Sequence, residues 1–435
     1  IINENSNTIT LGASGDTIAL ASGASQTGFG RTGTVDWQTS IKTATFTAAS
    51  GEGYFCNTSG GAFTVNLPSS PSVGDIVAIK DYGGSFGSNN LTIGRGGSNM
   101  NGFASDSVRD TTNESLTMVY ADATKGWLAV EEGTGFLGEK FIEATGGTIT
   151  TSGNCKIHTF TGPGTFQVCA VAACAANNVV SYMVVAGGGS GANGQPDRYT
   201  SGGGGAGGVR ETKSPVTPYT ASPLDGYSTP GNRITVTAQN YPITVGAGGS
   251  APPGGTPSTG GSGASSTFST ITSAGGGRGG SNDAGFNGGS GGGGSGPHAG
   301  GSGNTPPVTP SQGSTGGNGC GTWNSGRNAG GGGGGAGGVG GNGSSPGQLG
   351  GPGGTGVETN IPGSPLKVGG GGQGSTNDAV SPTAPFSDFG GGYWPAPNAN
   401  GSDNTGGGGS GGTYGGGQNG GAGGSGIVII RYKFQ

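Results

Sequence analysis

Short segments that alternate apolar and polar residues occupy the first part of the chain. Between residues 42 and 130 they recur about every 10 to 15 residues, with turn-forming residues between them. They read ATFTAAS, GYFCNTS, AFTVNLP, DIVAIKDY, NLTIGR, LTMVYAD and GWLAVEE. A period of two predicts half-buried β-strands, and this spacing is typical of an antiparallel sandwich or barrel. We therefore expect an antiparallel β module at residues 41–135.

A near-repeat precedes this module, because TITLGASG at residues 8–15 is followed by TIALASGA at residues 17–24. Each unit predicts a four-residue strand closed by a glycine turn. Strands this short do not form a stable domain alone, whereas three copies wrapped about an axis would share one narrow apolar core. We expect a trimeric fibre shaft at residues 1–40.

The β pattern continues over residues 136–186 with KIHTF, the turn TGPG, TFQVCAV and VVSYMVV. A last strand, IVIIRY, emerges from the final glycine run at residues 427–432. Since Val184 and Val185 enter the first glycine run and Ile427 leaves the last, we expect these two strands to pair. They would form a β base that is closed by a C-terminal strand at 427–433. Essentially no α-helix is expected.

Glycine dominates the rest of the chain: 27 of the 111 glycines precede Gly187, which leaves 84 in the last 249 residues. Such a segment has few side chains to bury, so it is either disordered or held by backbone contacts. Disordered chains usually carry high net charge, but here the net charge is −5 with 9% charged residues. We therefore favour a bundle of polyglycine-II helices, which resemble polyproline II, over residues 187–435.

About ten crossings are expected in this bundle, one for each dense glycine run. The run at 330–343 is counted as one crossing. The loops that connect these crossings are then expected at the two ends of the bundle. Residues 192–201 are expected at the far end, away from the β base, and residues 209–245 together with TFSTIT at the base. The runs are near 187–191, 202–208, 246–249, 275–280, 288–296, 330–343, 350–356, 369–374, 406–412 and 415–426.

Aromatic residues between the later runs are candidates for a recognition surface at the far end, because aromatics on loops of a rigid scaffold supply binding area at low entropic cost. A loop that merely covers the bundle is the alternative reading. Tyr219 and Tyr227 are further candidates. Deletion of residues 378–400 is expected to abolish host binding and to spare the fold. The candidate receptor-binding residues are Tyr199, Trp323, Phe386, Phe389, Tyr393 and Trp394.

No catalytic, metal or cofactor site is predicted. The two histidines, His158 and His298, lie far apart, GxGxxG strings arise by chance in so glycine-rich a chain, and no apolar run approaches 18 residues. Scattered basic residues make no stripe for nucleic acid, which excludes it as a partner. The chain begins without Met, as expected of a fragment or a mature product. Cys155 is expected either to pair with Cys169 or Cys174 or to be a free thiol.

The junction segments YMVVAGGGSGANG, YPITVGAGG, STFSTITSAGGG and GGSGIVIIRYKF resemble those of bacteriophage tail-fibre adhesins with a C-terminal polyglycine-II domain, including glycine-rich fibres of marine phages. The segment ITLGASGDTIALASGASQTGFG resembles phage fibre shafts. No site residue is carried over, because tip loops differ between phages.

This resemblance implies a non-enzymatic virion protein, extracellular and homotrimeric. It would bind a host cell-surface receptor, either an outer-membrane protein or a polysaccharide, and would contact other virion tail or fibre proteins. Two alternatives remain. One is a purely structural fibre or capsid decoration protein, and the other is a secreted glycine-rich ice-binding or matrix protein.

Overall fold

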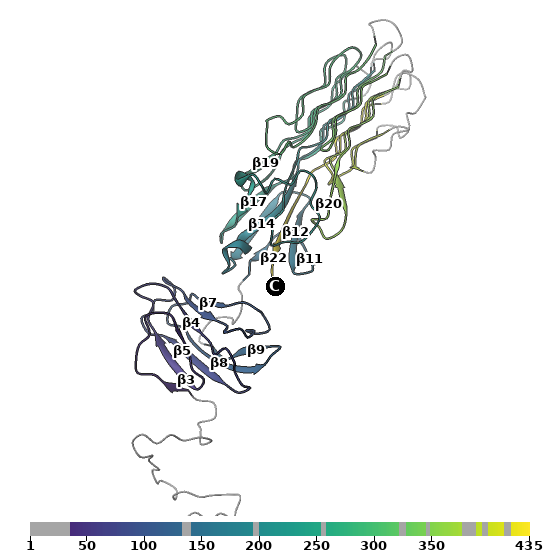
Figure 1. Ribbon diagram of the computed structural model, residues 1–435. Coiled ribbons are helices and arrows are strands. Elements are labelled where there is room, and N and C mark those ends of the chain that lie inside the picture. The colour runs from purple at the N-terminus through teal and green to yellow at the C-terminus, as the bar shows by residue number, and fades with distance from the viewer. Residues whose placement is uncertain are drawn as a thin grey trace, which may run out of the picture. The chain divides into compact units, whose positions relative to one another are not determined.

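The computed structural model describes residues 35–132, 141–194, 200–253, 258–321, 328–344, 349–375, 389–393, 399–412 and 419–435. The chain divides into two compact units, Ile1–Glu139 and Lys140–Gln435. As predicted, the described residues are mostly β, with two short 3-10 helices and no α-helix (Figure 1). The predicted shaft at 1–40 lies outside the described residues except for 35–40, which contain the first described strand.

The first unit contains two β-sheets, and successive strands from β1 to β6 alternate between them. Strands that neighbour each other in one sheet are therefore two apart in sequence and run parallel, as β3 and β5 or β4 and β6 do. One sheet has the order β1 (Asp36–Trp37), β3 (Glu52–Cys56), β5 (Ile76–Asp81), β8 (Ser115–Asp122), β9 (Gly126–Glu132). The other has the order β2 (Phe46–Thr47), β4 (Phe63–Asn66), β6 (Leu91–Gly94), β7 (Ser107–Arg109).

The prediction of an antiparallel module is therefore wrong for the first six strands. Among the described strands of this unit, the pairs β5–β8, β6–β7 and β8–β9 are antiparallel, and the pairs among β1 to β6 are parallel. Alternation of apolar residues fixes which face of a strand is buried, and it does so equally in both kinds of sheet. The inner faces of both sheets meet in one core that includes Trp127, Met118 and Leu91, all fully buried.

The second unit begins with a β base made of two larger sheets. The first has the order β11 (Thr148–Ser152), β12 (Cys155–Phe160), β22 (Ile427–Lys433), β14 (Val179–Val185), β15 (Val209–Thr212), and β16 (Ile234–Thr235) also pairs with β14. The second has the order β10 (Glu143–Thr145), β13 (Gly164–Ala170), β17 (Asn240–Thr244), β18 (Ser266–Phe268), β19 (Ile271–Ser273). A separate hairpin joins β20 (Val357–Thr359) and β21 (Leu366–Val368).

The expected pairing of the strands that flank the glycine-rich segment is confirmed. Val184 lies opposite Val428 and Val185 opposite Ile427 in the antiparallel β14–β22 ladder. Residues 209–212, 234–235 and 240–244 return to the base, as does TFSTIT, which forms β18 and β19. The chain thus leaves the base at Ala186 and re-enters it for the last time at Ile427.

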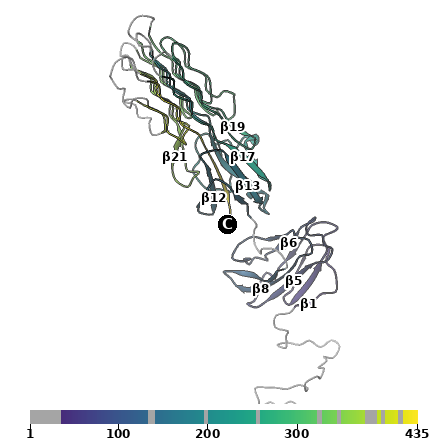
Figure 2. The same ribbon diagram turned by 180° about the vertical axis from the view of Figure 1, so that it is seen from behind.

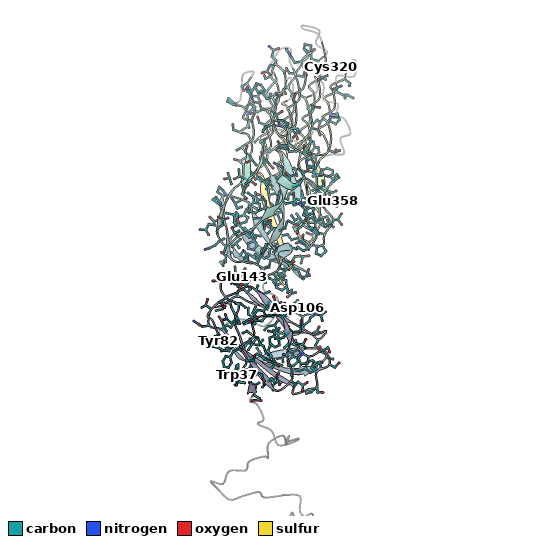
Figure 3. The ribbon with its side chains drawn as sticks, turned by 60° about the vertical axis from the view of Figure 1, so that its left-hand side comes forward. Trp37, Tyr82, Asp106, Glu143, Cys320 and Glu358 are labelled. Carbon is teal, nitrogen blue, oxygen red and sulfur yellow. The ribbon has the colours of Figure 1, made fainter. Side chains whose placement is uncertain are left out.

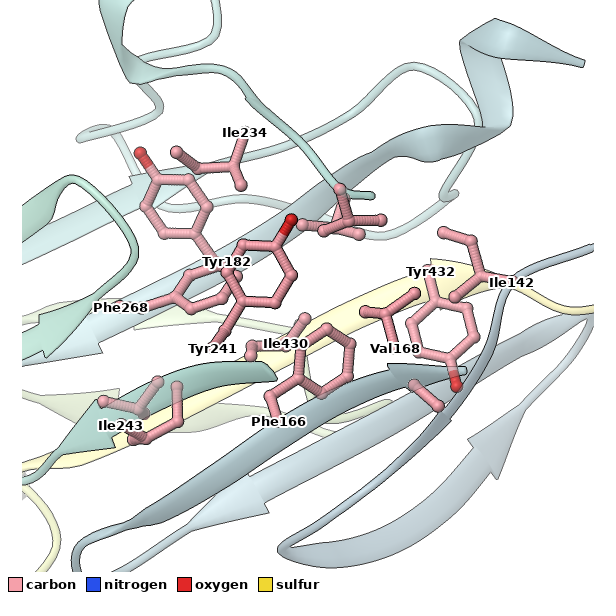
Figure 4. Close-up of a cluster of buried hydrophobic side chains, with 14 of the residues drawn as sticks. Ile142, Phe166, Val168, Tyr182, Ile234, Tyr241, Ile243, Phe268, Ile430 and Tyr432 are labelled. Carbon is pink, nitrogen blue, oxygen red and sulfur yellow. The ribbon is translucent and has the colours of Figure 1, made fainter. Parts of the chain in front are cut away.

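The base is held together by an aromatic and aliphatic core between its two sheets (Figure 4). Phe166 of β13 packs edge-on against Phe268 of β18, with ring centroids 6.1 Å apart, and Tyr182 of β14 meets the same Phe268 at 5.8 Å. Ile430 of β22 is fully buried in this core. Because these strands come from residues about 160 to 432, the core joins the two ends of the second unit.

All five cysteines are free thiols, so the alternative of an unpaired Cys155 applies. Cys155 is buried in β12, whereas Cys169 and Cys174 are exposed.

Glycine-rich segments extend from the strands of the base and run alongside one another (Figures 1 and 2). We call them the glycine array. Its segments outnumber the ten predicted crossings, and the run 330–343 is two segments rather than one, because the Gly332 N–H donates to Gly341 and the Gly335 N–H to Gly338. The segments are 186–193, 201–208, 246–250, 258–264, 274–280, 285–287, 288–295, 299–303, 313–320, 329–336, 338–343, 350–355, 369–375, 389–393, 399–403, 406–412 and 420–426.

The central segment, 202–208, donates every one of its backbone N–H groups to a neighbour, at N···O distances of 2.8 to 3.0 Å. The recipient changes with a period of three. Gly202, Gly205 and Gly208 donate to segment 274–280, Gly203 and Ala206 to segment 329–336, and Gly204 and Gly207 to segment 406–412.

The same segment accepts hydrogen bonds from three further neighbours, 186–193, 288–295 and 369–375. It is therefore surrounded by six segments, whereas a β-strand has two hydrogen-bonded neighbours. The hydrogen bonding capacity of the backbone is nearly all used inside the array.

Backbone contacts this close leave no room for a side chain at most of the glycine positions. A Cβ atom on Gly204 would lie 2.1 Å from the carbonyl oxygen of Gly189, and one on Gly333 would lie 1.9 Å from that of Gly204. By contrast, nothing lies within 4 Å of the Cβ position of Gly162, in the β12–β13 turn. A Cβ is thus excluded at Gly204 and Gly333, where segments touch, and is sterically allowed at Gly162.

Gly204→Ala should destabilise the second unit by about 3 kcal/mol or more, because neighbouring backbone must move apart to admit the methyl group. Gly162→Ala is the matched control and should change the unfolding free energy by less than about 1 kcal/mol. The melting temperatures of both variants and the wild type, from thermal unfolding, measure this loss of stability. Equal melting temperatures for the two variants would show that the array is not close-packed.

His158 of β12 is fully buried, and its Nδ1–H donates to the carbonyl oxygen of Gly146 at 2.7 Å, so Nε2 accepts from the hydroxyl of Tyr432 at 3.0 Å. The ring also stacks on that of Tyr432. Burial lowers the pKa of His158 below its ordinary value of 6.5, the Gly146 hydrogen bond raises it, and the charge of Lys156 lowers it further.

Since the folded pKa is depressed, the unfolded chain binds the proton first as the pH falls. The contribution of His158 to the free energy of unfolding is therefore complete above about pH 6.5. Below that pH it is lost, and the free energy of unfolding falls by up to about 1.4 kcal/mol per pH unit. Denaturant unfolding between pH 7 and pH 5 should show this slope in the wild type and a shallower one in His158→Gln. Identical slopes would contradict the assignment.

Candidate functional site

The glycine array has two ends, one at the strands of the base and one opposite, which we call the far end. Figure 3 shows Glu358 of β20 near the strands and Cys320 at the far end. At the far end the described backbone includes residues 192–194, 200–201, 281–283, 295–298, 318–321, 342–344 and 410–412. This end is the candidate functional site, because here side chains rather than packed backbone face outward.

Asn193 terminates the first glycine segment and ties three others to it. Its side-chain Nδ2 donates to the carbonyl oxygen of Pro253 at 2.7 Å and to the hydroxyl of Ser258 at 3.3 Å. Its Oδ1 accepts from the N–H of Gly420 at 2.6 Å. The side chain is only 3% exposed, so these bonds are made without competition from water. Asn193 therefore caps the backbone groups that the array leaves unpaired where it ends.

Serines make a second set of caps. The Ser201 N–H donates to the Ser375 hydroxyl at 2.6 Å, and the Ser201 hydroxyl donates to the carbonyl oxygen of Gly412 at 2.8 Å. Ser281 donates to the carbonyl oxygen of Asn193 at 2.8 Å and connects this set to the first. Both Ser201 and Ser375 are buried. The far end is consequently a cross-linked polar layer rather than a set of free ends.

An acidic turn adds charge to this layer. Asp283 accepts the N–H of Ser281 through Oδ1 at 2.6 Å, and its own N–H donates to the hydroxyl of Ser295 at 3.1 Å. His298 lies one turn further on, with its N–H bonded to the carbonyl oxygen of Ser295 at 3.0 Å.

Tyr393 lies at the far end with 43% of its surface exposed, whereas Phe389 does not lie there. The carbonyl oxygen of Phe389 accepts the N–H of Gly370, next to β21, and the Nζ of Lys367 in β21 lies 5.4 Å from its ring centroid. Placing Phe389 in a far-end loop with Tyr393 is thus wrong. The three intervening glycines, buried in the array, carry the chain from one end to the other.

Tyr199, Trp323, Phe386 and Trp394 lie outside the described residues, so their predicted placement is not tested. Tyr219 and Tyr227 lie at the base, as predicted for residues 209–245, so they do not contribute to the far end. Tyr219 packs against the cluster of β14 and β15 residues, and the guanidinium of Arg233 lies 4.5 Å from the Tyr227 ring centroid.

Glu211 is the most deeply buried carboxylate in the base, and its contacts are structural. It accepts from the hydroxyl of Thr359 at 2.6 Å and from the N–H of Ser222 at 2.9 Å. Burial raises its pKa, although the hydrogen bonds to Ser222, Thr359 and Tyr219 act in the opposite direction. Glu211 thus joins β15 to the β20 hairpin.

Within the described ranges, no three His, Cys, Asp or Glu residues come together as a metal site requires. A helix with the length and apolarity to cross a membrane is likewise not found in that part of the chain.

Comparison with known families matches residues 159–433 to a glycine-rich domain. The match covers more than half of the chain and runs from the end of β12 to the end of β22. The chain belongs to the glycine-rich domain family. No curated protein matches it. The boundaries of the glycine-rich domain thus enclose β14, the array and β22, together with the far end.

Sequence reasoning found the aromatic candidates but missed Asn193, Ser201, Ser281 and Ser375. Many other Asn and Ser residues of the chain have a similar sequence context, so these four could not be distinguished by residue type. What they share is that each directly flanks or ends a glycine segment. A residue that follows a run has to satisfy backbone groups that the next turn leaves open.

Asn193→Ala should leave the Gly420 N–H buried and unpaired, at a cost of about 1 to 3 kcal/mol. Amide exchange at Gly420 and its neighbours should accelerate while the base stays protected. Asn287→Ala is the control, because Asn287 bonds the Ser302 N–H at an exposed position where water can replace it. Exchange by mass spectrometry compares the two variants, and equal behaviour would refute the capping role.

Proposed function

We propose that the glycine array of the glycine-rich domain is a polyglycine-II helix bundle. The support is the period of three in its hydrogen bonding, which 186–192 and 330–336 share with 202–208. The N–H groups of Gly187 and Ser190 donate to segment 258–264, those of Gly188 and Gly191 to 420–426, and those of Gly189 and Ala192 to 201–208. A threefold helix of polyproline II type presents its backbone groups to three directions in this order.

Such a bundle would be a rigid support. Each hydrogen bond contributes about 0.5 to 1.5 kcal/mol net, and in segments such as 202–208 every N–H makes one. Six contacts around each inner helix restrain it in all lateral directions. A support of this kind holds end loops in place without any hydrophobic core of its own.

We propose that the protein is a phage virion fibre that acts as a host-receptor adhesin through its far end. Three properties of this end support receptor recognition rather than a role of the array as a structural spacer. It is distant from the strands, it is polar and cross-linked by Asn193 and Ser201, and it exposes an aromatic ring at Tyr393. Rigid polar surfaces with exposed aromatics are favourable for binding, because little conformational entropy is lost.

In this proposal the N-terminal part attaches the domain to the virion. The repeat at residues 8–24 would form a trimeric shaft, other tail or fibre proteins would hold it, and binding would involve no catalysis or cofactor. Candidate receptors are an outer-membrane protein or a surface polysaccharide of the host. The far-end candidates remain Tyr199, Trp323, Phe386, Tyr393 and Trp394.

Point substitutions test the far end better than deletion of residues 378–400. Gly390, Gly391 and Gly392 are buried in the array, and Cβ positions there would contact neighbouring backbone or Thr405. Deletion would remove array segments along with the loop, and loss of binding would then be uninformative.

The purified full chain, added to host cells before the phage, should block adsorption. Tyr393→Ala should weaken this block about tenfold, as expected for an aromatic hot spot. Glu358→Ala, an exposed change at the base, should leave it unchanged.

Immunogold labelling of particles supplies the second readout. The adhesin proposal predicts label at fibre tips. Label on the capsid surface, with no block of adsorption by the wild-type chain, would favour the structural alternative.

A further inference from the structure

The first unit carries three aromatic rings in a row on the outer face of its larger sheet. Trp37 lies on β1, Phe55 on β3 and Tyr82 directly after β5, and these three strands are neighbours in the sheet. The ring centroids of Trp37 and Phe55 are 4.9 Å apart, and those of Phe55 and Tyr82 are 6.4 Å apart. Trp37 is 41% and Tyr82 is 56% exposed (Figure 3). We call these rings the aromatic row.

The aromatic row belongs to the outer face because the inner face is already occupied. Tyr54 and Cys56 of β3 point into the core, so Phe55 between them points outward. Asp81 is turned inward, where its carboxylate accepts the N–H groups of Ser85 and Phe86, so Tyr82 after it points outward.

Gly53 has no side chain, and this leaves room for the indole of Trp37. Trp37 lies opposite Gly53 in the β1–β3 ladder, and a Cβ on Gly53 would come within 2.8 Å of the indole. The indole therefore lies directly against the backbone of β3, with one ring face supported. A ring held in this way loses little freedom when a ligand covers its other face.

Polar groups flank the row. Lys80 is the cross-strand partner of Phe55, so its side chain stands on the same face. Asn57 directly follows β3, two residues after Phe55, and the Cβ position of Gly83, beside Tyr82, is 2.5 Å from its Oδ1. Hydrogen-bonding side chains thus border an apolar strip.

The size of the row argues for a small occupant. At 150 to 250 Å² per aromatic side chain, the exposed fractions of Trp37 and Tyr82 amount to roughly 200 Å² of ring surface. A stable protein interface needs about 800 Å² per partner. A few sugar rings match the smaller area, since the C–H faces of pyranoses stack on the electron-rich faces of aromatic rings and their hydroxyls bond to flanking polar groups.

We propose that the aromatic row is a binding site for a neutral, linear polysaccharide, separate from the far end. This site does not depend on the adhesin proposal, because it resides in the other compact unit.

Native gels cast with hydroxyethylcellulose, laminarin or dextran test the site on the full chain. The wild type should be retarded in at least one of these gels. Trp37→Ala and Tyr82→Ala should each weaken the retardation about tenfold in apparent affinity. Circular dichroism and elution volume verify that both variants keep the fold.

One control separates the possible outcomes. Val130→Ser changes an exposed residue of β9 on the same sheet and should retain full binding. Unretarded wild type in all three gels overturns the proposal, as does equal weakening by Val130→Ser. Sedimentation that shows a dimer in the wild type and a monomer in Trp37→Ala would instead assign the row to a second copy of the chain.

Discussion

Hydrogen bonds between the backbones of neighbouring glycine segments are the interaction on which the second unit depends. In an ordinary domain, buried apolar area offsets the entropy of ordering the chain. Here the inner segments have almost no side chains, and backbone N–H and carbonyl groups meet at 2.8 to 3.2 Å around 202–208. The same contacts exclude a Cβ, so the glycine composition is a steric requirement of the bonding pattern. Composition and architecture are thus two descriptions of one constraint.

Backbone hydrogen bonding between glycine segments does not by itself fix the register of one segment against the next, because every glycine offers the same backbone groups. Register is instead imposed at the base, where β14 leads into the array and β22 leads out of it. Val185 pairs with Ile427, and one residue further the segments 186–193 and 420–426 begin. The hydrophobic core around Phe166 and Phe268 fixes both strands. Side-chain packing at one end therefore specifies an arrangement that the backbone maintains along the rest of the array.

The features predicted correctly from the sequence are those marked by side chains. Val185 and Ile427 flank the runs and pair, and TFSTIT lies at the base, because apolar alternation identifies strands wherever it occurs. The turn within 330–343 was missed because glycine has the same appearance at a bend and in a straight segment. Phe389 and Tyr393 were assigned to one loop because three glycines were too few to suggest a crossing. Alternation also does not distinguish parallel from antiparallel strands, which explains the misreading of the first unit.

The two units meet the requirement of rigidity by different means, and this affects what each can present. The core of the first unit is formed by the inner faces of its sheets, so side chains on the outer face are not needed for packing. Trp37, Phe55 and Tyr82 are therefore held by the sheet in fixed positions on that face. Inside the array most residues are glycines at which a Cβ would clash with neighbouring carbonyl groups, and the other buried positions hold small residues such as Ala206 and Ser190. Larger side chains such as Phe286 are partly exposed at its surface. In the proposed adhesin, such a body would allow the turns at the far end to differ in sequence while the hydrogen bonds between segments are kept.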